Sequence, residues 1–350
     1  MTSKRSSGMA QAGLLLLAAF FGGVIVVMAL GRMPARSIAA PVQGAARSVH
    51  VAATPCDFVT VPLSGFRRAR PVLYSEPECP STALDPIRDS LALLVLDHIK
   101  AGDITNASVY FRDMTNNEWT VVNDSAEFKT SSTRRMSVLL TYLRMAEQDP
   151  QLFQRMFEVE GRATENAAPF GGLQCSVVVP GHRYSVRQLL ESDVKCSDDL
   201  ANSVLMRHID KDMLRRTVQD LRGNDGRDPD KQYPTTARRY AVSMKALYES
   251  DMLSPMVSDY AMNLLVDSGI RTGLTSGVPD SVQVARRFTV VQGDGGRAEL
   301  HECAVFYLDP KPYMGSIMTQ GQRFDKLPAV IQDISRFVYR YRQGSRSVNG

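Results

Sequence analysis

Ser132 and Arg135 are the residues of this chain whose types and spacing bear most directly on chemistry. The serine falls where an amphipathic helix is expected to begin, because apolar residues follow it at helical spacing: Met136, Val138, Leu139, Leu140, Leu143 and Met145. A separation of three puts Ser132 and Arg135 on one helix face. Enzymes with a Ser-x-x-Lys pair use an amine that can lose its proton, whereas a guanidinium stays charged at any working pH. The turn therefore combines a serine nucleophile with a cation that cannot act as its base.

Two further segments carry candidate site residues. One is the Cys-Ser-Asp-Asp run at 196–199, which opens another expected helix. The other lies in an expected strand and contributes Arg286, Arg287, Phe288 and Thr289. Each also has a simple structural interpretation, since serine and acids favour helix starts and paired arginines protect edge strands. Ser131 or Ser132 is equally suited to cap its own helix.

Together, the order and spacing of these segments resemble the class A serine β-lactamases and related penicillin-recognising proteins. The resemblance covers residues 85–341 and includes Phe128, four residues before Ser132. Members carry Ser-x-x-Lys, Ser-Asp-Asn and Lys-Thr-Gly motifs. The resemblance implies that Ser132 is the nucleophile and Ser197 a proton relay, and that Arg135 and Asp199 replace the lysine and the asparagine. In the third motif the lysine, threonine and glycine are replaced by Arg287, Phe288 and Thr289.

The substituted positions are those that hydrolysis needs. A serine hydroxyl is a weak nucleophile until a base takes its proton, and Arg135 cannot take one. Class A enzymes use a glutamate on a loop after the second motif for deacylation through water. No glutamate occurs here between Glu191 and Glu249, and the acids that remain in the loop are Asp225, Asp228 and Asp230.

Two geometric expectations follow from the resemblance. Phe288 should crowd the groove beside its strand, while Arg287 could still anchor a carboxylate through paired donors. In the family the lysine hydrogen-bonds the asparagine, so we expect Arg135 and Asp199 to form a bidentate guanidinium–carboxylate pair. Such a pair would hold two lobes together without transferring a proton.

The pattern of expected elements predicts the fold class. Helices are expected at 85–100, after Ser132 and at 326–341, residues 151–265 are mostly helical by pattern, and strands are expected at 107–114, 118–122, 281–291, 298–308 and 313–319. This order predicts an α/β domain in which an antiparallel sheet is built from both chain ends, with flanking helices and an inserted all-helical lobe. The resemblance implies the same layout.

The pattern of the N-terminal region predicts a membrane anchor and a stalk. Residues 13–30 are uncharged and apolar, and about 18 such residues just span a bilayer. Lys4 and Arg5 favour a cytoplasmic N-terminus. We therefore expect a cytoplasmic tail at 1–12, a transmembrane anchor at 13–30, a stalk at 31–84, the β-lactamase-like domain at 85–343 and a disordered tail at 344–350. The alternative is a cleaved signal peptide, and both place the domain outside the cytoplasm.

The cysteines and histidines give no sign of a metal site. Five cysteines occur in a compartment that permits disulfides, and their odd number leaves at least one thiol without an intramolecular partner: Cys56, Cys79, Cys175, Cys196 and Cys303. Cys196 is expected to be a small buried hydrophobe. The sequence has no Cys-x-x-Cys pair, and its five histidines are scattered. We expect neither a cofactor nor a metal.

Composition and motifs together favour a binding protein over an enzyme. A net charge of +4, without a basic block, gives no basis for nucleic-acid binding. The first hypothesis is an extracytoplasmic relative without hydrolytic activity that binds a peptidoglycan-like ligand or a protein partner. The alternative is an active β-lactamase or penicillin-binding hydrolase that forms an acyl-enzyme on Ser132. A purely structural tether is the remaining option.

Overall fold

The computed structural model describes residues 65–71, 81–129, 133–161, 177–223, 225–266, 271–293 and 296–344. These ranges belong to one compact unit, Ala52–Gly350. The expected anchor at 13–30, residues 345–350 and Ser132 itself lie outside the described residues. In the described part of the chain no helix is long and apolar enough to cross a membrane.

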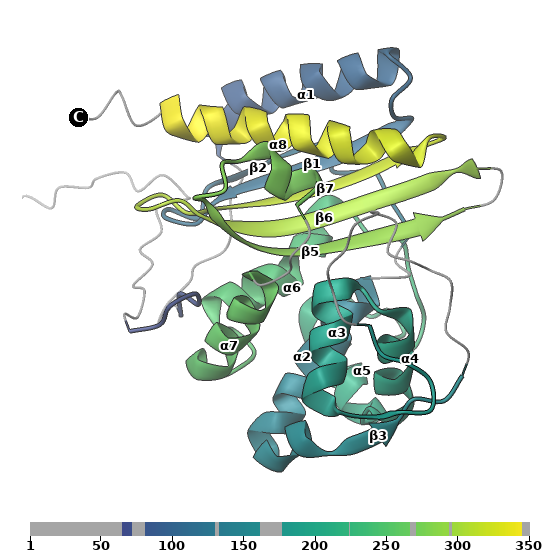
Figure 1. The fold of residues 1–350 in the computed structure, drawn as a ribbon. Coiled ribbons are helices and arrows are strands. Elements are labelled where there is room, and N and C mark those ends of the chain that lie inside the picture. The colour runs from purple at the N-terminus through teal and green to yellow at the C-terminus, as the bar shows by residue number, and fades with distance from the viewer. Residues whose placement is uncertain are drawn as a thin grey trace, which may run out of the picture. The chain divides into compact units, whose positions relative to one another are not determined.

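A five-stranded antiparallel sheet forms the centre of the domain (Figure 1). Its strand order is β2-β1-β7-β6-β5, which places strands from the two ends of the domain side by side. The strands are β1 (Asn106–Asp113), β2 (Trp119–Val122), β5 (Gln283–Gln292), β6 (Ala298–Tyr307) and β7 (Tyr313–Gly321). Val109 of β1 pairs with Ile317 of β7, so the prediction of an antiparallel sheet built from both chain ends is confirmed.

Two helices from opposite ends of the domain cover one face of this sheet (Figure 1). Helix α1 (Asp85–Lys100) follows the 3₁₀ turn η1 (Thr82–Leu84) and has Pro86 in its first turn, where the missing N–H costs nothing. Helix α8 (Leu327–Gly344) follows η5 (Phe324–Lys326). Leu91 of α1 and Ile334 of α8 are buried in one apolar cluster with sheet residues such as Phe306. The 3₁₀ turn η3 (Gly273–Gly277) packs beside α8.

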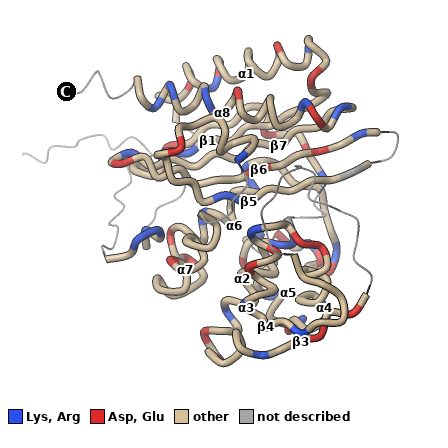
Figure 2. Tube along the Cα trace, viewed as in Figure 1, with Lys and Arg blue, Asp and Glu red and all other residues tan. Residues whose placement is uncertain are grey.

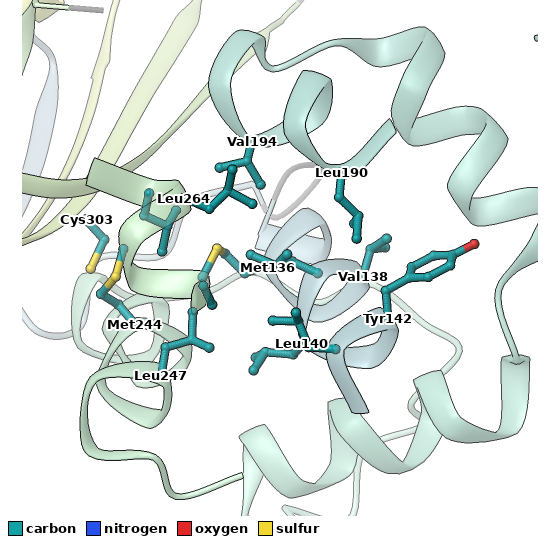
Figure 3. Close-up of a cluster of buried hydrophobic side chains, with 14 of the residues drawn as sticks. Met136, Val138, Leu140, Tyr142, Leu190, Val194, Met244, Leu247, Leu264 and Cys303 are labelled. Carbon is teal, nitrogen blue, oxygen red and sulfur yellow. The ribbon is translucent and has the colours of Figure 1, made fainter. Parts of the chain in front are cut away.

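The helical lobe lies against the other face of the sheet. It comprises α2 (Thr133–Gln148), α3 (Val186–Cys196), α4 (Asp199–His208), α5 (Lys211–Arg222), α6 (Ala237–Glu249), α7 (Pro255–Val266) and η2 (Pro150–Gln154). Figure 3 shows apolar side chains of this lobe meeting in one cluster, among them Met136 of α2, Leu190 of α3 and Leu247 of α6. Cys303 of β6 borders the cluster, which joins the lobe to the sheet.

Two features differ from the sequence pattern. A short hairpin of β3 (Met156–Glu158) and β4 (Arg183–Ser185) interrupts the segment expected to be helical. Residues 65–71, which the pattern assigns to the stalk, contact the domain: Ala69 donates its N–H to Asp259, and Tyr307 donates its hydroxyl to the carbonyl of Arg68. Strands of three residues are too short for a period-two pattern to be distinctive.

Candidate functional site

The segment that leads into α2 is held by backbone and side-chain bonds on both sides. Phe128 and Thr235 exchange two backbone hydrogen bonds of 2.9 and 3.0 Å, which ties this segment to the loop before α6. The backbone N–H of Lys129 donates to the Glu299 carboxylate of β6 at 3.0 Å. Ser132 and the two residues before it lie outside the described residues.

The junction between α3 and α4 presents the second candidate segment. Ser197 adopts a left-handed conformation, φ 51° and ψ 40°, and ends α3. Asp198 then caps α4: one carboxylate oxygen accepts the N–H groups of Leu200 and Ala201, and the other accepts from Val178 and Ser192. An aspartate that satisfies four donors fixes the turn and holds Ser197 in its left-handed conformation. Among the described residues the Ser197 hydroxyl has no hydrogen-bond partner.

Arg135 is held between two carboxylates across this junction. Its Nη1 lies 2.5 Å from Asp193 and 3.3 Å from the Asp198 carbonyl oxygen, and its Nη2 pairs with Asp199. The expected ion pair between Arg135 and Asp199 is therefore present. It is not the bidentate pair that was predicted, because the guanidinium divides its two terminal nitrogens between two acids.

Asp193 is the centre of this network and was missed from the sequence. Its Oδ1 contacts Arg135 and also lies 3.3 Å from Nη2 of Arg287. The Nη1 of Arg287 donates to the backbone carbonyl oxygens of Asp193 and Val194 at 2.7 and 3.0 Å. Asp193 is fully buried. The available signal was its spacing of four from buried Leu189, because a carboxylate in the apolar stripe of a helix must be paired.

The charges in this network keep Arg135 protonated. Burial alone would lower the pKa of Arg135, but the charges of Asp193 and Asp199 outweigh burial and raise that pKa. Burial lowers the pKa of Arg287, and the Asp193 charge opposes the shift. A guanidinium is already too basic to accept a proton from a serine, and the network strengthens that preference.

The prediction that Phe288 crowds a groove is wrong. Successive strand residues point to opposite faces, so Phe288 shares the face of Arg286 and not that of Arg287. Its ring is only 3% exposed and packs against Arg286, whose guanidinium carbon lies 5.2 Å from the ring centroid. Thr289 lies on the lobe face, where its hydroxyl accepts a 3.4 Å bond from Tyr240.

The role of carboxylate anchor expected for Arg287 is also contradicted. The side chain is 2% exposed, and its terminal nitrogens already donate to α3. Arg287 thus ties β5 to the helical lobe, and a ligand would have to displace these bonds to reach it.

The acids of the loop before α6 are all engaged by cations. Asp225 lies 3.5 Å from Arg227 and 4.0 Å from Arg239, and both oxygens of Asp230 accept from Arg215 at 2.9 Å. The hydrogen bonds from Arg215 lower the pKa of Asp230. Asp228 lies 3.7 Å from Lys231. A carboxylate stabilised in its ionised form by an arginine is a weaker base than a free one.

A buried histidine and glutamate form a second site feature that the sequence did not reveal. His301 of β6 lies on the lobe face of the sheet, with Nε2 3.1 Å from the Glu299 carboxylate that also holds Lys129. Its ring meets Phe128 edge to face at 5.3 Å. Burial lowers the pKa of His301, which favours a neutral imidazole. The signal was the spacing of two residues within one strand, which puts both side chains on one face.

The two cysteines of the described residues are each bonded or buried. Cys196 is disulfide-bonded, and its partner lies outside the described residues. Cys303 is a free buried thiol, and burial raises its pKa to about 12. Within the described ranges, no group of three or more histidine, cysteine, aspartate or glutamate side chains could hold a metal ion.

An antiparallel sheet with two helices on one face and a helical lobe on the other is the arrangement of the class A β-lactamase fold. Solved structures share it. A complex of a PBP-A mutant, described as an acyl-enzyme with penicillin G, is 19% identical, covers 77% of this chain and all of its own, and has a TM-score of 0.58. A β-lactamase from Sphaerobacter thermophilus is 14% identical, and the match covers 72% of this chain and 96% of the β-lactamase, with a TM-score of 0.61.

The sequence family is defined by a separate comparison. The model of the β-lactamase enzyme family matches residues 91–342, most of the chain. The chain therefore belongs to this family, as its resemblance to the class A serine enzymes implied. No curated protein matches it.

Proposed function

We propose that this protein is a membrane-anchored, extracytoplasmic member of its family that does not turn over β-lactams and instead binds a cell-wall-type ligand or a protein partner. One observation carries the proposal: Arg135, at the position of the general-base lysine, is paired with Asp193 and Asp199. Proton abstraction from serine needs a group with a pKa near the working pH. A guanidinium held by two carboxylates is far from that condition.

The loop supports the same conclusion for deacylation. Its three aspartates are each engaged by an arginine or a lysine, and no glutamate is present between Glu191 and Glu249. An acyl-enzyme formed by chance on Ser132 would lack a base to activate water. The cell-wall class of ligand rests on the family alone, in which a PBP-A mutant has been captured with penicillin G.

The localisation also belongs to the proposal. Residues 13–30 would anchor the chain, with the domain outside the cytoplasm. The disulfide at Cys196 supports this placement, because disulfides persist in oxidising compartments.

The proposal is tested by intact-protein mass spectrometry. Wild-type protein and Ser132→Ala are incubated with excess penicillin G, and samples are taken from seconds to hours. We expect no adduct that forms and then decays. An adduct on the wild type that appears and is lost with time, and is absent from Ser132→Ala, would show turnover and overturn the proposal.

A second function, an active acyl-enzyme on Ser132, is favoured by the His301–Glu299 pair. An ionised carboxylate only accepts hydrogen bonds, so Nε2 of a neutral His301 carries the proton and Nδ1 is left as an acceptor. Among the described residues Nδ1 has no hydrogen-bond partner. The pair lies beside the segment that leads to Ser132, held through Lys129. If turnover is observed and is lost in His301→Phe, this function replaces the first.

A further inference from the structure

A pocket that is separate from the arginine–aspartate network lies under the loop that joins α5 to α6. Its volume is about 210 Å³, and its walls come from the first turns of α2, the end of α5, the start of α6 and the loop itself. None of Arg135, Asp193, Asp199 and Arg287 contributes to the lining. The pocket is thus a candidate site in its own right.

The lining is strongly cationic. Five cations line the pocket against two carboxylates, Asp225 and Asp230; the cations are Arg134, Arg222, Arg227, Lys231 and Arg239. Asp230 is already bound through both oxygens by Arg215, which lies outside the lining. The lining residues alone therefore carry an excess of three positive charges, and Asp228, outside the lining, lies 3.7 Å from Lys231.

Two of these cations, Arg134 and Arg222, are not in ion pairs with any acid of the described residues, although the charge of Arg134 contributes to the lowered pKa of Asp230. Arg222 is nevertheless held in place, because its terminal nitrogens donate to the carbonyl oxygens of Asp228 and Lys231 at 3.2 Å. Carbonyl groups orient a guanidinium without cancelling its charge.

The ring of Tyr233 restricts two arginines of the lining, Arg222 and Arg227. The guanidinium carbons of Arg222 and Arg227 each lie 5.2 Å from the centroid of its ring. Stacking on an aromatic ring restricts a long side chain, so less conformational entropy is lost when a ligand binds. The fork of a guanidinium also matches the oxygens of a phosphate or carboxylate.

We propose that this pocket binds a small organic dianion, with Arg134 and Arg222 as its principal contacts. The volume limits the ligand to about the size of a monosaccharide phosphate or a short dicarboxylate. The excess positive charge selects for two negative charges, and the ring of Tyr233 and the apolar side chain of Val242 line a wall for a carbon skeleton. The site does not depend on the function proposed for Ser132.

Isothermal titration calorimetry on the full chain tests this site, with glucose 6-phosphate, succinate and uncharged glucose as probes. We expect a dianion to bind and glucose not to bind, and the two anionic probes distinguish a phosphate site from a dicarboxylate site. Arg222→Gln should weaken binding about tenfold, because it removes one charge-assisted hydrogen bond to the ligand. Arg134→Gln, at an exposed position, should also weaken it without affecting folding.

The matched control is Arg340→Gln, which removes an exposed arginine from α8, away from the lining. We expect it to bind like the wild type, as should Ser132→Ala. The proposal is overturned if neither dianion binds, or if Arg222→Gln and Arg134→Gln both bind like Arg340→Gln. The titration does not involve Ser132, and the mass-spectrometric test does not involve the pocket, so the two proposals can fail separately.

Discussion

Two consecutive arginines of β5, Arg286 and Arg287, are both fully buried and perform different tasks. Figure 2 shows blue, cationic positions along β5. Arg286 faces the helices α1 and α8, where it donates to the Thr272 carbonyl oxygen at 2.7 Å and pairs with Glu302 at 3.3 Å. Arg287 faces the helical lobe and pairs with Asp193. The difference shows that adjacent residues of one type can serve two separate networks.

The two networks differ in what else they hold. Glu302 also accepts the N–H of Leu274 at 3.0 Å, and Gly273 passes so close, with φ 55°, that any Cβ there would overlap its carboxylate. That network fixes η3 against the sheet. Asp193 holds two guanidinium groups and thereby connects α2, α3 and β5 at the position where the family has its catalytic centre. Of the two networks, the second contains the residues that replace the family's lysine and asparagine.

The largest effect is expected when Asp193 is replaced by alanine. The change leaves Arg135 and Arg287 without their shared carboxylate, and breaking a buried ion pair costs about 3–5 kcal/mol. Urea unfolding measures the loss of free energy. Asp212→Ala, which removes an exposed acid from α5, is the control. A loss below about 1 kcal/mol, typical of a surface pair, would contradict the central role of Asp193.

Glu302→Gln tests the opposite face. Glutamine keeps the size of the side chain and can still accept from Leu274, but it removes the charge that faces Arg286, so we expect a loss of about 2 kcal/mol. Native-state hydrogen exchange should show weaker protection in α8 and unchanged protection in α3, and the reverse in the Asp193 variant. An equal loss of protection in α3 and α8 in either variant would show that the two networks are not separate.

His301 predicts how stability depends on pH. Burial lowers its pKa in the folded state, so below pH 6.5 the unfolded chain binds a proton that the folded chain does not. The free energy of unfolding therefore falls as pH decreases, by up to about 1.4 kcal/mol per pH unit for one proton. His301→Phe should flatten the curve between pH 7 and 5, measured by urea unfolding at each pH.

The lowered pKa of Glu299 acts in the same direction but at lower pH, below the range of this test. His182→Gln, which removes an exposed imidazole, is the control. An unchanged slope in His301→Phe would mean that the buried imidazole does not govern the pH dependence.

Asp199→Asn should have the smallest effect. Asp199 is the outer member of the Arg135 network, with its side chain 48% exposed, and a solvent-exposed pair contributes about 0.2–1 kcal/mol. The substitution restores the asparagine of the family motif, yet it leaves Arg135 paired with Asp193. We expect thermal unfolding to shift by a few degrees at most and β-lactam hydrolysis to stay absent. A loss of stability as large as that of Asp193→Ala would contradict the smaller contribution that we assign to Asp199.

The sequence predicted much of the fold because its patterns are local and strong. Period-two and helical patterns located the sheet strands and the helices that flank them, and the replacement of a lysine and an asparagine by Arg135 and Asp199 indicated their ion pair. The short β3–β4 hairpin escaped because three residues carry almost no periodic signal.

The site was predicted less completely, because faces and buried charges depend on tertiary context. Phe288 was assigned to the wrong face, since a shift of one residue along a strand reverses every side chain. Asp193 and His301 lie among apolar neighbours, and only the folded structure shows that their partners come from elements distant in sequence or from the same strand face.

The measurement that tests the central claim most directly is steady-state hydrolysis of a chromogenic β-lactam by the wild type, Ser132→Ala and His301→Phe. The claim is that Arg135, held by Asp193 and Asp199, serves the structure and not proton transfer. It predicts equal rates for the three proteins, all at the level of the uncatalysed reaction. A wild-type rate that is clearly above that of Ser132→Ala, and that is kept in His301→Phe, would contradict it.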